Sequence, residues 1–404
     1  MPALSELRTP LPHELAVEVV ERKGIGHPDT LADGIAELAS IRYSRHCLDT
    51  VGVVLHHNLD KVAVLGGRAV FTDTDGFYDR PLRVVFGGRI STTFAGRPLP
   101  VRDILRQAAL DHLRKTLPGF DRVTVEVRHE TTDSSKFPTW FAPRSREDLP
   151  ERVRAFSNDT AYLVGAAART PTETLVLLAE AWFRRLPWAG SDIKALAVRN
   201  GTTWTVTVCV PALAGHLTTA AEFDDAVTGA AADLTAVLQQ RLPGPVTVVC
   251  NTRGSRTGPL SGQYFTLSGS AVDYGEDGLV GRGNARTGVI SGAHLAGNEA
   301  TYGKNPAYHV GKVGGWLADE AARAVAGQFG PCRVALLWRN GAPYSEPASI
   351  EITTTHPQPP AAAADLVRAT LARTDWMEDL LSGRYLPAVH PIEDLLSELE
   401  RAVT

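Results

Sequence analysis

Charged side chains are concentrated in a glycine-rich stretch in the second half of the chain. Residues 272–312 read VDYGEDGLVGRGNARTGVISGAHLAGNEATYGKNPAYHVGK, with few large apolar residues. Glycines let backbone N–H groups close on oxygen atoms, cations neutralise phosphate charge, and carboxylates hold Mg²⁺. The composition is typical of a loop that wraps a polyphosphate and its metal, but a long surface loop with solvated charges has the same composition. Its charged and amide side chains include Asp273, Glu276, Asp277, Arg282, Asn284, Arg286, Glu299, Lys304, Asn305, His309 and Lys312.

This stretch is not a phosphate loop of the Walker type. Lys304 is followed by Asn305 and not by Ser or Thr, and no glycine stands five positions before Gly303. The Walker pattern requires both features, because its hydroxyl binds the metal and its glycines shape the backbone around the phosphates. Phosphate binding here must therefore use another arrangement of cations and backbone groups.

A second candidate corner lies near the N-terminus, where residues 21–34 read ERKGIGHPDTLADG. Pro28 suits the first position of a helix, and Asp29 then falls in the first turn. His27 stands just before this helix, where unpaired N–H groups favour an anion. The residues predict a phosphate-and-metal corner, while an ordinary capped helix whose Asp29 complements the helix dipole is the alternative.

Five blocks in this order resemble one known family. They are GHPDTLADGIAE (26–37), LHHNLDKV (55–62), NDTAYLVG (158–165), GEDGLVGRGN (275–284) and GKNPAYHVGK (303–312). Together the blocks resemble the archaeal-type methionine adenosyltransferases, also called S-adenosylmethionine synthetases. Any one block is a weak signal, but the ordered set spans most of the chain and is specific.

The resemblance implies an enzyme that makes S-adenosylmethionine from ATP and L-methionine and releases phosphate and diphosphate. It implies Mg²⁺ and K⁺ as cofactors and a homodimer with the active site between subunits. The implied residues fall into four groups. They are His27, Lys304 and Arg282 for catalysis; His27, Asp29, Asp277, Arg282, Lys304 and Lys312 for ATP; Asp159 and Asp133 for methionine; and Asp29, Glu276, Asp277 and Glu21 for metal.

The implied reaction needs charge stabilisation more than it needs a base. A thioether sulfur is a neutral nucleophile that attacks C5′ of ATP, and the whole triphosphate leaves before it is hydrolysed. Positioning and electrostatic stabilisation of the leaving group therefore lower the barrier. We expect His27 to donate a hydrogen bond to the departing oxygen, and Arg282 and Lys304 to neutralise the phosphates.

Several positions depart from the family pattern and keep a second function open. Glu276 stands where the family usually has Asp, and the segment 128–134 reads RHETTDS with only Asp133 retained. His294 lies near a usual Arg in SGAHLAGNEATY (291–302). The alternative is a divergent relative that expels triphosphate from ATP with water or another nucleophile. A nucleotide-binding subunit without turnover is a third class, and the retained His27, Asp29 and Lys304 speak against it.

Strands and helices that alternate irregularly must position these residues. Apolar periodicity predicts helices over 28–47, 101–116, 172–185, 221–241, 315–328, 362–374 and 392–402. Alternation and apolar runs predict strands over 14–21, 51–56, 61–65, 82–86, 123–127, 204–210, 246–250, 334–338 and 350–354. The order argues for an α+β fold with mixed sheets and against a doubly wound parallel sheet. Residues 129–155 have no periodicity and predict a mobile loop or lid.

The resemblance, and not the spacing, implies three pseudo-symmetric α/β subdomains built from discontinuous segments. We expect the first over 22–135, the second over 1–21 plus 150–245, and the third over 246–404. The first would carry the His27 corner and the third the glycine-rich loop.

Bulk composition excludes several classes of protein. The 404 residues are 44% apolar and 21% charged, with a net charge of −4, so neither nucleic acid nor anionic membrane is an expected partner. No apolar run approaches the ~20 residues of a membrane span, and the polar, proline-broken N-terminus does not read as a signal peptide. Cys209 and Cys250 are expected to be buried free thiols. We therefore expect a cytoplasmic protein.

Overall fold

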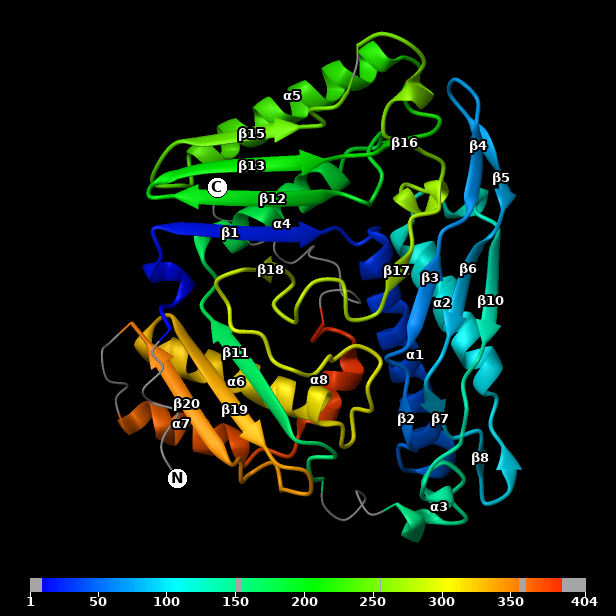
Figure 1. Cartoon of the computed structure of the whole chain (residues 1–404), viewed down its shortest axis with the longest axis vertical. Coiled ribbons are helices and arrows are strands. Elements are labelled where there is room, and N and C mark those ends of the chain that lie inside the picture. Colours follow the sequence, from blue (N-terminus) through cyan, green and yellow to red (C-terminus); the bar gives the residue numbers. More distant parts are fainter. Residues whose placement is uncertain (1–8, 150–154, 255, 356–360, 387–404) are drawn as a thin grey trace.

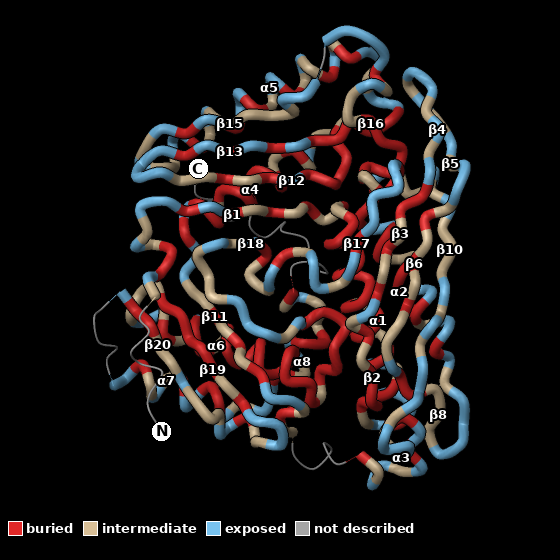
Figure 2. The backbone as a smooth tube through the Cα atoms, in the orientation of Figure 1, coloured by how far each residue is buried: buried red, intermediate tan, exposed pale blue. Residues whose placement is uncertain are grey.

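Three sheets, each covered by a pair of helices, make up the chain (Figure 1). The structure is a computed structural model that describes residues 9–149, 155–254, 256–355 and 361–386. Each sheet and its helices enclose a separate apolar core. Buried positions are dense along the inner helices of these units (Figure 2).

The first unit carries the start of the His27 helix. Helix α1 begins directly after His27 because Pro28 fits its first position, and it ends at Gly52, whose left-handed backbone closes it. It packs beside α2 on a four-stranded sheet of order β10-β6-β3-β17. The bounds are α1 Pro28–Val51, α2 Val101–Thr116, β3 Val62–Leu65, β6 Leu82–Phe86, β10 Val125–His129 and β17 Gly278–Leu279.

The second unit has a five-stranded sheet with order β15-β13-β12-β1-β18. In β13 the Trp204, Val206 and Val208 side chains are buried and the intervening residues are exposed, so one face packs on α4 and α5 while the other stays uncovered. The bounds are β1 Val17–Lys23, β12 Lys194–Asn200, β13 Thr203–Cys209, β15 Val246–Cys250, β18 Ile290–Ser291, α4 Pro171–Arg184 and α5 Ala220–Gln239.

The third unit places α6 and α7 on a three-stranded antiparallel sheet of order β11-β19-β20. The bounds are β11 Ala161–Ala167, β19 Cys332–Trp338, β20 Ser349–Thr354, α6 Val310–Phe329, α7 Ala361–Leu371 and α8 Trp376–Ser382. Short pairs complete the fold: β4 Arg68–Phe71 with β5 Gly76–Arg80, β2 His57–Asn58 with β7 Arg89–Ile90, β8 Thr93–Phe94 with β9 Arg97–Pro98, and β14 Ala212–Leu213 with β16 Phe265–Thr266. Helix α3 is the single turn Pro138–Phe141.

The expected α+β class with mixed sheets is confirmed. The β10–β6 and β13–β15 pairs are parallel, and the other pairs of the three large sheets are antiparallel. Pseudo-symmetry and the three residue ranges remain predictions. In the three large sheets, four strand pairs cross an expected boundary: β11 with β19, β15 with β13, β17 with β3, and β18 with β1.

Some local expectations were wrong. Residues 51–56 are not a strand, because α1 runs on to Val51 and pairing resumes only at His57. Cys209 is exposed and Cys250 half-buried, because the apolar run of β13 has only one covered face. Helix α6 starts five residues before the expected 315. The helix expected over 392–402 lies outside the described residues.

No helix in the described ranges is both long enough and apolar enough to cross a bilayer. The loop 129–155 is only partly irregular, since it contains α3, and Trp140 of that turn stacks on His56. Residues 150–154 of this loop are outside the description, so a lid role remains a prediction.

Candidate active site

Glycine contacts fix the main chain that leads into His27. The Gly24 N–H donates to the Ile193 carbonyl at 2.8 Å, and the Gly26 N–H donates to the Ser191 carbonyl at 3.1 Å. An added Cβ at Gly26 would lie 2.1 Å from the Ser191 Oγ atom, so no larger residue fits there. The two glycines press the turn against the segment before β12 and set the direction in which His27 leaves the sheet.

A buried carboxylate holds the other side of this turn. Asp192 accepts hydrogen bonds from the Ala271 N–H at 2.9 Å and the Tyr264 hydroxyl at 3.0 Å. Burial raises its pKa to about 6. The adjacent Ser270 hydroxyl donates to the Gly26 carbonyl at 2.6 Å. The start of the glycine-rich stretch is thereby tied to the His27 corner.

His27 caps helix α1 in a way that sets its tautomer. Its Nδ1 atom accepts from the Asp29 N–H at 3.2 Å, so the proton of the neutral ring is on Nε2. Burial, together with the positive charge of Lys23, lowers its pKa to about 4. At neutral pH this residue is therefore an uncharged imidazole whose Nε2–H group is available as a donor.

The depressed pKa of His27 predicts how stability depends on pH. Between its folded pKa of about 4 and the ordinary value near 6.5, the folded state binds fewer protons at this ring than the unfolded state does. Stability from this residue must therefore rise with pH across that window. We expect the urea midpoint of the wild type to fall more between pH 6.5 and pH 4.5 than that of His27→Asn. Equal slopes for the two proteins would contradict this assignment.

Asp29 is held by two donors at the start of α1. Its Oδ2 atom accepts from the Lys23 ammonium at 2.8 Å, and its Oδ1 atom accepts from the Leu279 N–H at 3.0 Å. Burial raises its pKa, but the hydrogen bond from Lys23 and that from Leu279 outweigh burial and lower the pKa overall. Asp29 is thus an ionised carboxylate with a cation already on one oxygen.

The backbone around Arg282 is braced by α1 and β1. Asp33 accepts from the Gly281 N–H at 2.7 Å, and the Lys23 ammonium donates to the Arg282 carbonyl at 2.6 Å. The Asn284 side-chain amide donates to the Lys23 carbonyl at 2.7 Å and accepts from the Lys23 N–H at 3.0 Å. The Arg282 side chain is exposed, and no partner of its guanidinium is found among the described residues. The bracing leaves this cation directed at solvent on a fixed backbone.

The other proposed metal residues lie at the edge of this corner. Glu276 and Asp277 are exposed, and Asp277 accepts from the Gly66 N–H at 2.9 Å. Glu21 lies 3.6 Å from the Lys194 ammonium. No group of three His, Cys, Asp or Glu side chains that could hold a metal occurs in the described ranges. Mg²⁺ commonly takes one or two protein carboxylates and completes its shell with phosphate oxygens and water, so an ionised Asp29 fits that ion when nucleotide is bound.

A second polar cluster surrounds the start of α6. The Lys304 ammonium is buried and contacts Glu299 at 2.6 Å and Asp60 at 3.3 Å. His309 caps α6 as His27 caps α1, with Nδ1 accepting from the Gly311 N–H at 3.2 Å. Burial and the Lys304 charge hold its pKa well below the ordinary value. His309 is therefore a second neutral imidazole beside a cation, a role that its sequence context did not indicate.

Lys312 is not placed like the other proposed ATP-binding cations. Its ammonium forms an ion pair with Glu37 in which both side chains are almost fully buried. The same Glu37 oxygen accepts from the Gly303 N–H at 3.0 Å. The pair links α1, the GKNP segment and α6, so its immediate role in this structure is to hold these elements together.

The ion pair predicts a large stability change for Lys312→Met. That change leaves the Glu37 charge buried without its cation, which should cost about 3–5 kcal/mol of unfolding free energy. The double variant Lys312→Met with Glu37→Gln removes both charges and keeps an acceptor for Gly303, so it should recover most of the loss. Chemical denaturation of both variants measures this. A stable single variant with weakened ATP binding would instead place Lys312 at the nucleotide.

The two proposed methionine carboxylates are exposed and engaged locally. Asp133 accepts from the Thr92 hydroxyl at 2.9 Å, and Asp159 accepts from the Thr160 N–H at 2.7 Å. No contact in the described parts of the chain brings either one to His27. Their role remains a prediction that depends on the resemblance.

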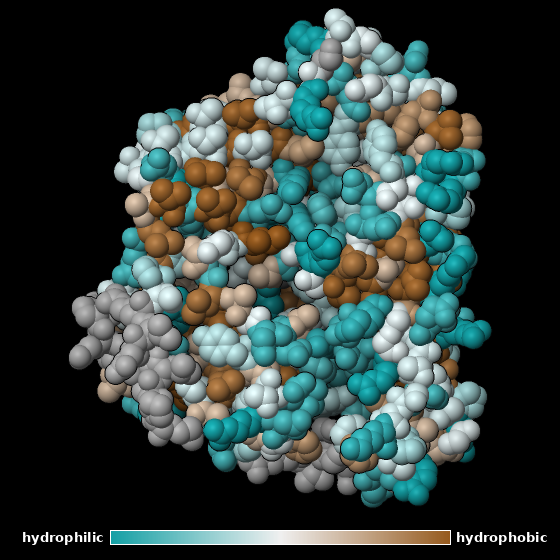
Figure 3. Space-filling view, in the orientation of Figure 1, coloured by the Kyte–Doolittle hydropathy of each residue, from teal (hydrophilic) through white to brown (hydrophobic). Residues whose placement is uncertain are grey.

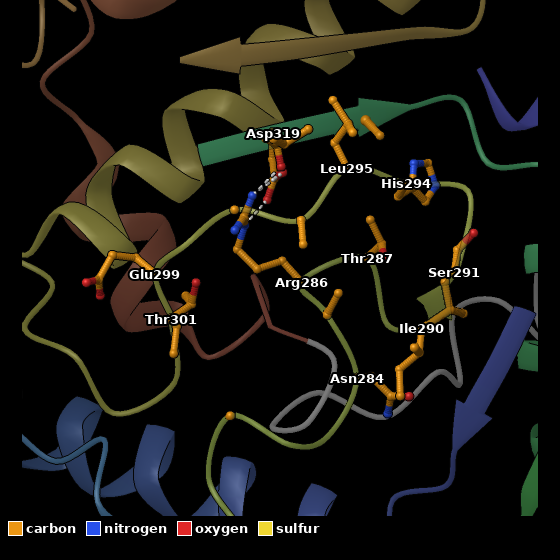
Figure 4. A pocket seen from close by; sticks show the side chains of 18 of the residues that line it. Asn284, Arg286, Thr287, Ile290, Ser291, His294, Leu295, Glu299, Thr301 and Asp319 are labelled. Atoms are coloured by element: carbon orange, nitrogen blue, oxygen red, sulfur yellow. Dashed lines mark hydrogen bonds and ion pairs between the residues drawn. The ribbon is translucent and has the colours of Figure 1, made fainter. Parts of the chain in front are cut away.

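A cavity of about 450 Å³ separates the two polar clusters (Figure 4). Residues 281–302 form most of its wall, with β11 and α6 on the other side. Arg286 and Asp319 both line it and form an ion pair at 2.9 Å. The lining residue His294 contacts the Glu173 carboxylate at 2.6 Å. Gly281 and Gly283 line one end and Glu299 the other. Segment 291–302, one of those that depart from the family pattern, thus lines the cavity.

The two clusters attach to different levels of the same helix. His27 begins α1, whereas the Ser40 hydroxyl donates to the Lys304 carbonyl at 3.2 Å. From His27 to Ser40 the helix rises roughly 20 Å at about 1.5 Å per residue. Within one chain, the His27 corner and the Lys304 main chain therefore lie at different levels along α1.

Comparison with known proteins agrees with the motifs. The family described as S-adenosylmethionine synthetase (AdoMet synthetase) matches residues 3–379. S-adenosylmethionine synthase of Haloarcula marismortui is 34% identical over 348 residues, covering 83% of this chain and 84% of that protein. The synthase of Methanococcus aeolicus is 32% identical over 359 residues, covering 85% and 87%. An uncharacterized protein of Streptococcus pyogenes serotype M3 is 34% identical over 356 residues, with the same coverage. The chain therefore belongs to the S-adenosylmethionine synthetase family, a family of transferases.

Proposed function

We propose that this protein is a methionine adenosyltransferase that forms S-adenosylmethionine from ATP and L-methionine. The triphosphate that leaves is cleaved to phosphate and diphosphate. The observation that carries this proposal is the neutral His27 at the N-terminus of α1, where the Lys23 charge acts on the imidazole and the Lys23 ammonium also holds the Arg282 main chain. A hydrogen-bond donor among cations suits a leaving group that gains negative charge.

Each residue of the corner has a role in this proposal. His27 donates to the oxygen that bridges C5′ and the triphosphate, and needs no proton transfer because the sulfur nucleophile carries no proton to remove. Arg282 contacts the phosphates from its braced backbone. Asp29, with Glu276 or Asp277 and with Glu21 nearby, would hold Mg²⁺, which supplies neutralising charge on the phosphates. K⁺ is part of the proposal by family membership alone.

A homodimer is proposed because it would bring the two clusters of different chains together. Val17 and Val19 on β1 are 51% and 43% exposed, and Ile290 on β18 is 36% exposed. Glu21 and Lys23 follow them on the same face of β1, since side chains alternate along a strand. Figure 3 shows apolar patches over β1 and its neighbours and over the β17 region, with a polar band between them. A partner seated on this face would lie directly against the His27 corner.

The proposed interface predicts the effect of Val19→Asp. A charge buried without a partner in an interface costs about 2 kcal/mol or more, so dimer affinity should fall by at least about 30-fold. Sedimentation measures the change, and activity should fall with the dimer fraction. Val70→Asp is the matched control, since Val70 is 41% exposed on the separate β4–β5 hairpin. Dimers that survive Val19→Asp would exclude this face.

A divergent reaction with another nucleophile is the second candidate. The altered segment 291–302 lines the cavity, and His294 there is engaged by Glu173. The experiment incubates the protein with ATP and Mg²⁺, with and without methionine, and identifies the adenosine product by mass spectrometry. A sulfonium product that requires methionine supports the proposed function. Triphosphate release without methionine and without that product would replace it by the divergent reaction.

A further inference from the structure

We propose that Lys23 is a triphosphate-binding residue that rests on Asp29 until metal and nucleotide arrive. The proposal rests on the proposed function, because it assigns a new role within that same site. Lys23 is the last residue of β1, and its side chain is 15% exposed. It therefore borders the corner and is open to a ligand.

Among the described residues, Asp29 is the carboxylate that pairs with the Lys23 ammonium. Its Nζ atom lies 2.8 Å from Asp29 Oδ2 and 2.6 Å from the Arg282 carbonyl. The backbone of Lys23 is fixed by both hydrogen bonds of the Asn284 amide. The main chain thus cannot shift easily, while the flexible side chain can move its charge by several ångströms.

The Asp29 carboxylate explains why the ammonium must move. Oδ1 accepts the Leu279 N–H, and Oδ2, the oxygen without a main-chain donor among the described residues, accepts the Lys23 ammonium. A divalent ion bound at Oδ2 would repel an ammonium at hydrogen-bond distance. Triphosphate delivered with that ion offers the nearest new negative charge. We infer that Lys23 exchanges the carboxylate for a phosphate oxygen when the nucleotide binds.

The exchange predicts opposite effects on two ligands, measured without turnover. In Lys23→Met of the full chain, Mn²⁺ alone should bind more tightly, by about fivefold or more, because its competitor at Asp29 is gone. Inorganic tripolyphosphate without metal should bind at least about tenfold more weakly, the scale of one lost charged hydrogen bond. Titration calorimetry measures both. A purely structural lysine would weaken both ligands together, and that result would overturn the proposal.

Two further variants make the result specific. Lys115→Met is the matched control, because Lys115 is an exposed lysine on α2; it should change either affinity by less than about twofold. Lys23→Arg keeps the charge and should bind tripolyphosphate within about threefold of wild type, so it tests the proposal even if Lys23→Met does not fold. If Lys23→Arg folds but binds tripolyphosphate at least about tenfold more weakly than the wild type, the proposal is overturned. If the two affinities respond as expected but no sulfonium product forms, the proposed function fails while the role of Lys23 stands.

Discussion

His27→Ala is expected to lower kcat by roughly 10²-fold or more, with a change of less than about threefold in the KM for ATP. The loss is on the scale of removing one donor that acts on charge developing in the transition state. The ring is neutral with its proton on Nε2, so the contribution we propose for it is a hydrogen bond to the leaving oxygen. Steady-state kinetics with saturating methionine measures both constants.

The His27 side chain also caps α1, so the two roles must be separated. An alanine at an N-cap costs about 1 kcal/mol of stability. His27→Asn retains an acceptor for the Asp29 N–H and should restore the melting temperature while kcat stays low, because the amide is shorter and its N–H group stops before the leaving oxygen. If His27→Ala weakened ATP binding and left kcat unchanged, the role of His27 in the chemical step would be wrong.

The parts of the site that could be predicted are those whose signals are local. Pro28 after His27 indicates a helix start, and the structure places an N-cap histidine there. Arg282 lies in a glycine-rich segment whose backbone can turn sharply, and it is indeed exposed at the same corner. Alternation predicted the covered and uncovered faces of β13. In each case the deciding interaction spans only a few residues.

The missed features depend on contacts between distant segments. Lys23 reads as a surface lysine until Asp29 and Arg282 are folded against it. Lys312 shares a cation-rich motif with Lys304, yet only its partner Glu37, far away in α1, makes it a buried ion pair. Strands β11 and β12 were missed because their small residues give a weak apolar signal, and pairing with β19 and β1 decides their structure. The roles of these lysines and the structure of these strands are decided by burial and charge neutralisation between distant segments, which the spacing of residues in the sequence does not reveal.

Arg282→Ala is expected to lower kcat/KM for ATP by roughly 10²–10³-fold while leaving the fold intact. The guanidinium is exposed and makes no hydrogen bond or ion pair within the described residues, so its removal should change the unfolding free energy by no more than about 0.5 kcal/mol. Asp33 and Lys23 hold the backbone at Gly281 and Arg282 in place, so the proposed contact with the phosphates would start from a fixed main chain. Arg282→Lys keeps the charge but loses the two-pronged geometry and should recover only part of the rate.

Arg286 provides the contrast that tests this reasoning. It lies in the same loop but binds Asp319 at 2.9 Å and the Val164 carbonyl at 2.7 Å. Because the pair is buried, Arg286→Ala should cost about 3–5 kcal/mol of stability, a signature opposite to that of Arg282→Ala. Denaturation curves and kcat/KM measured on both variants separate a ligand-binding arginine from a structural one. Should Arg282→Ala keep full activity, or lose stability as Arg286→Ala does, the leaving triphosphate is not held at this corner and the charge that stabilises it must come from the Lys304 cluster instead.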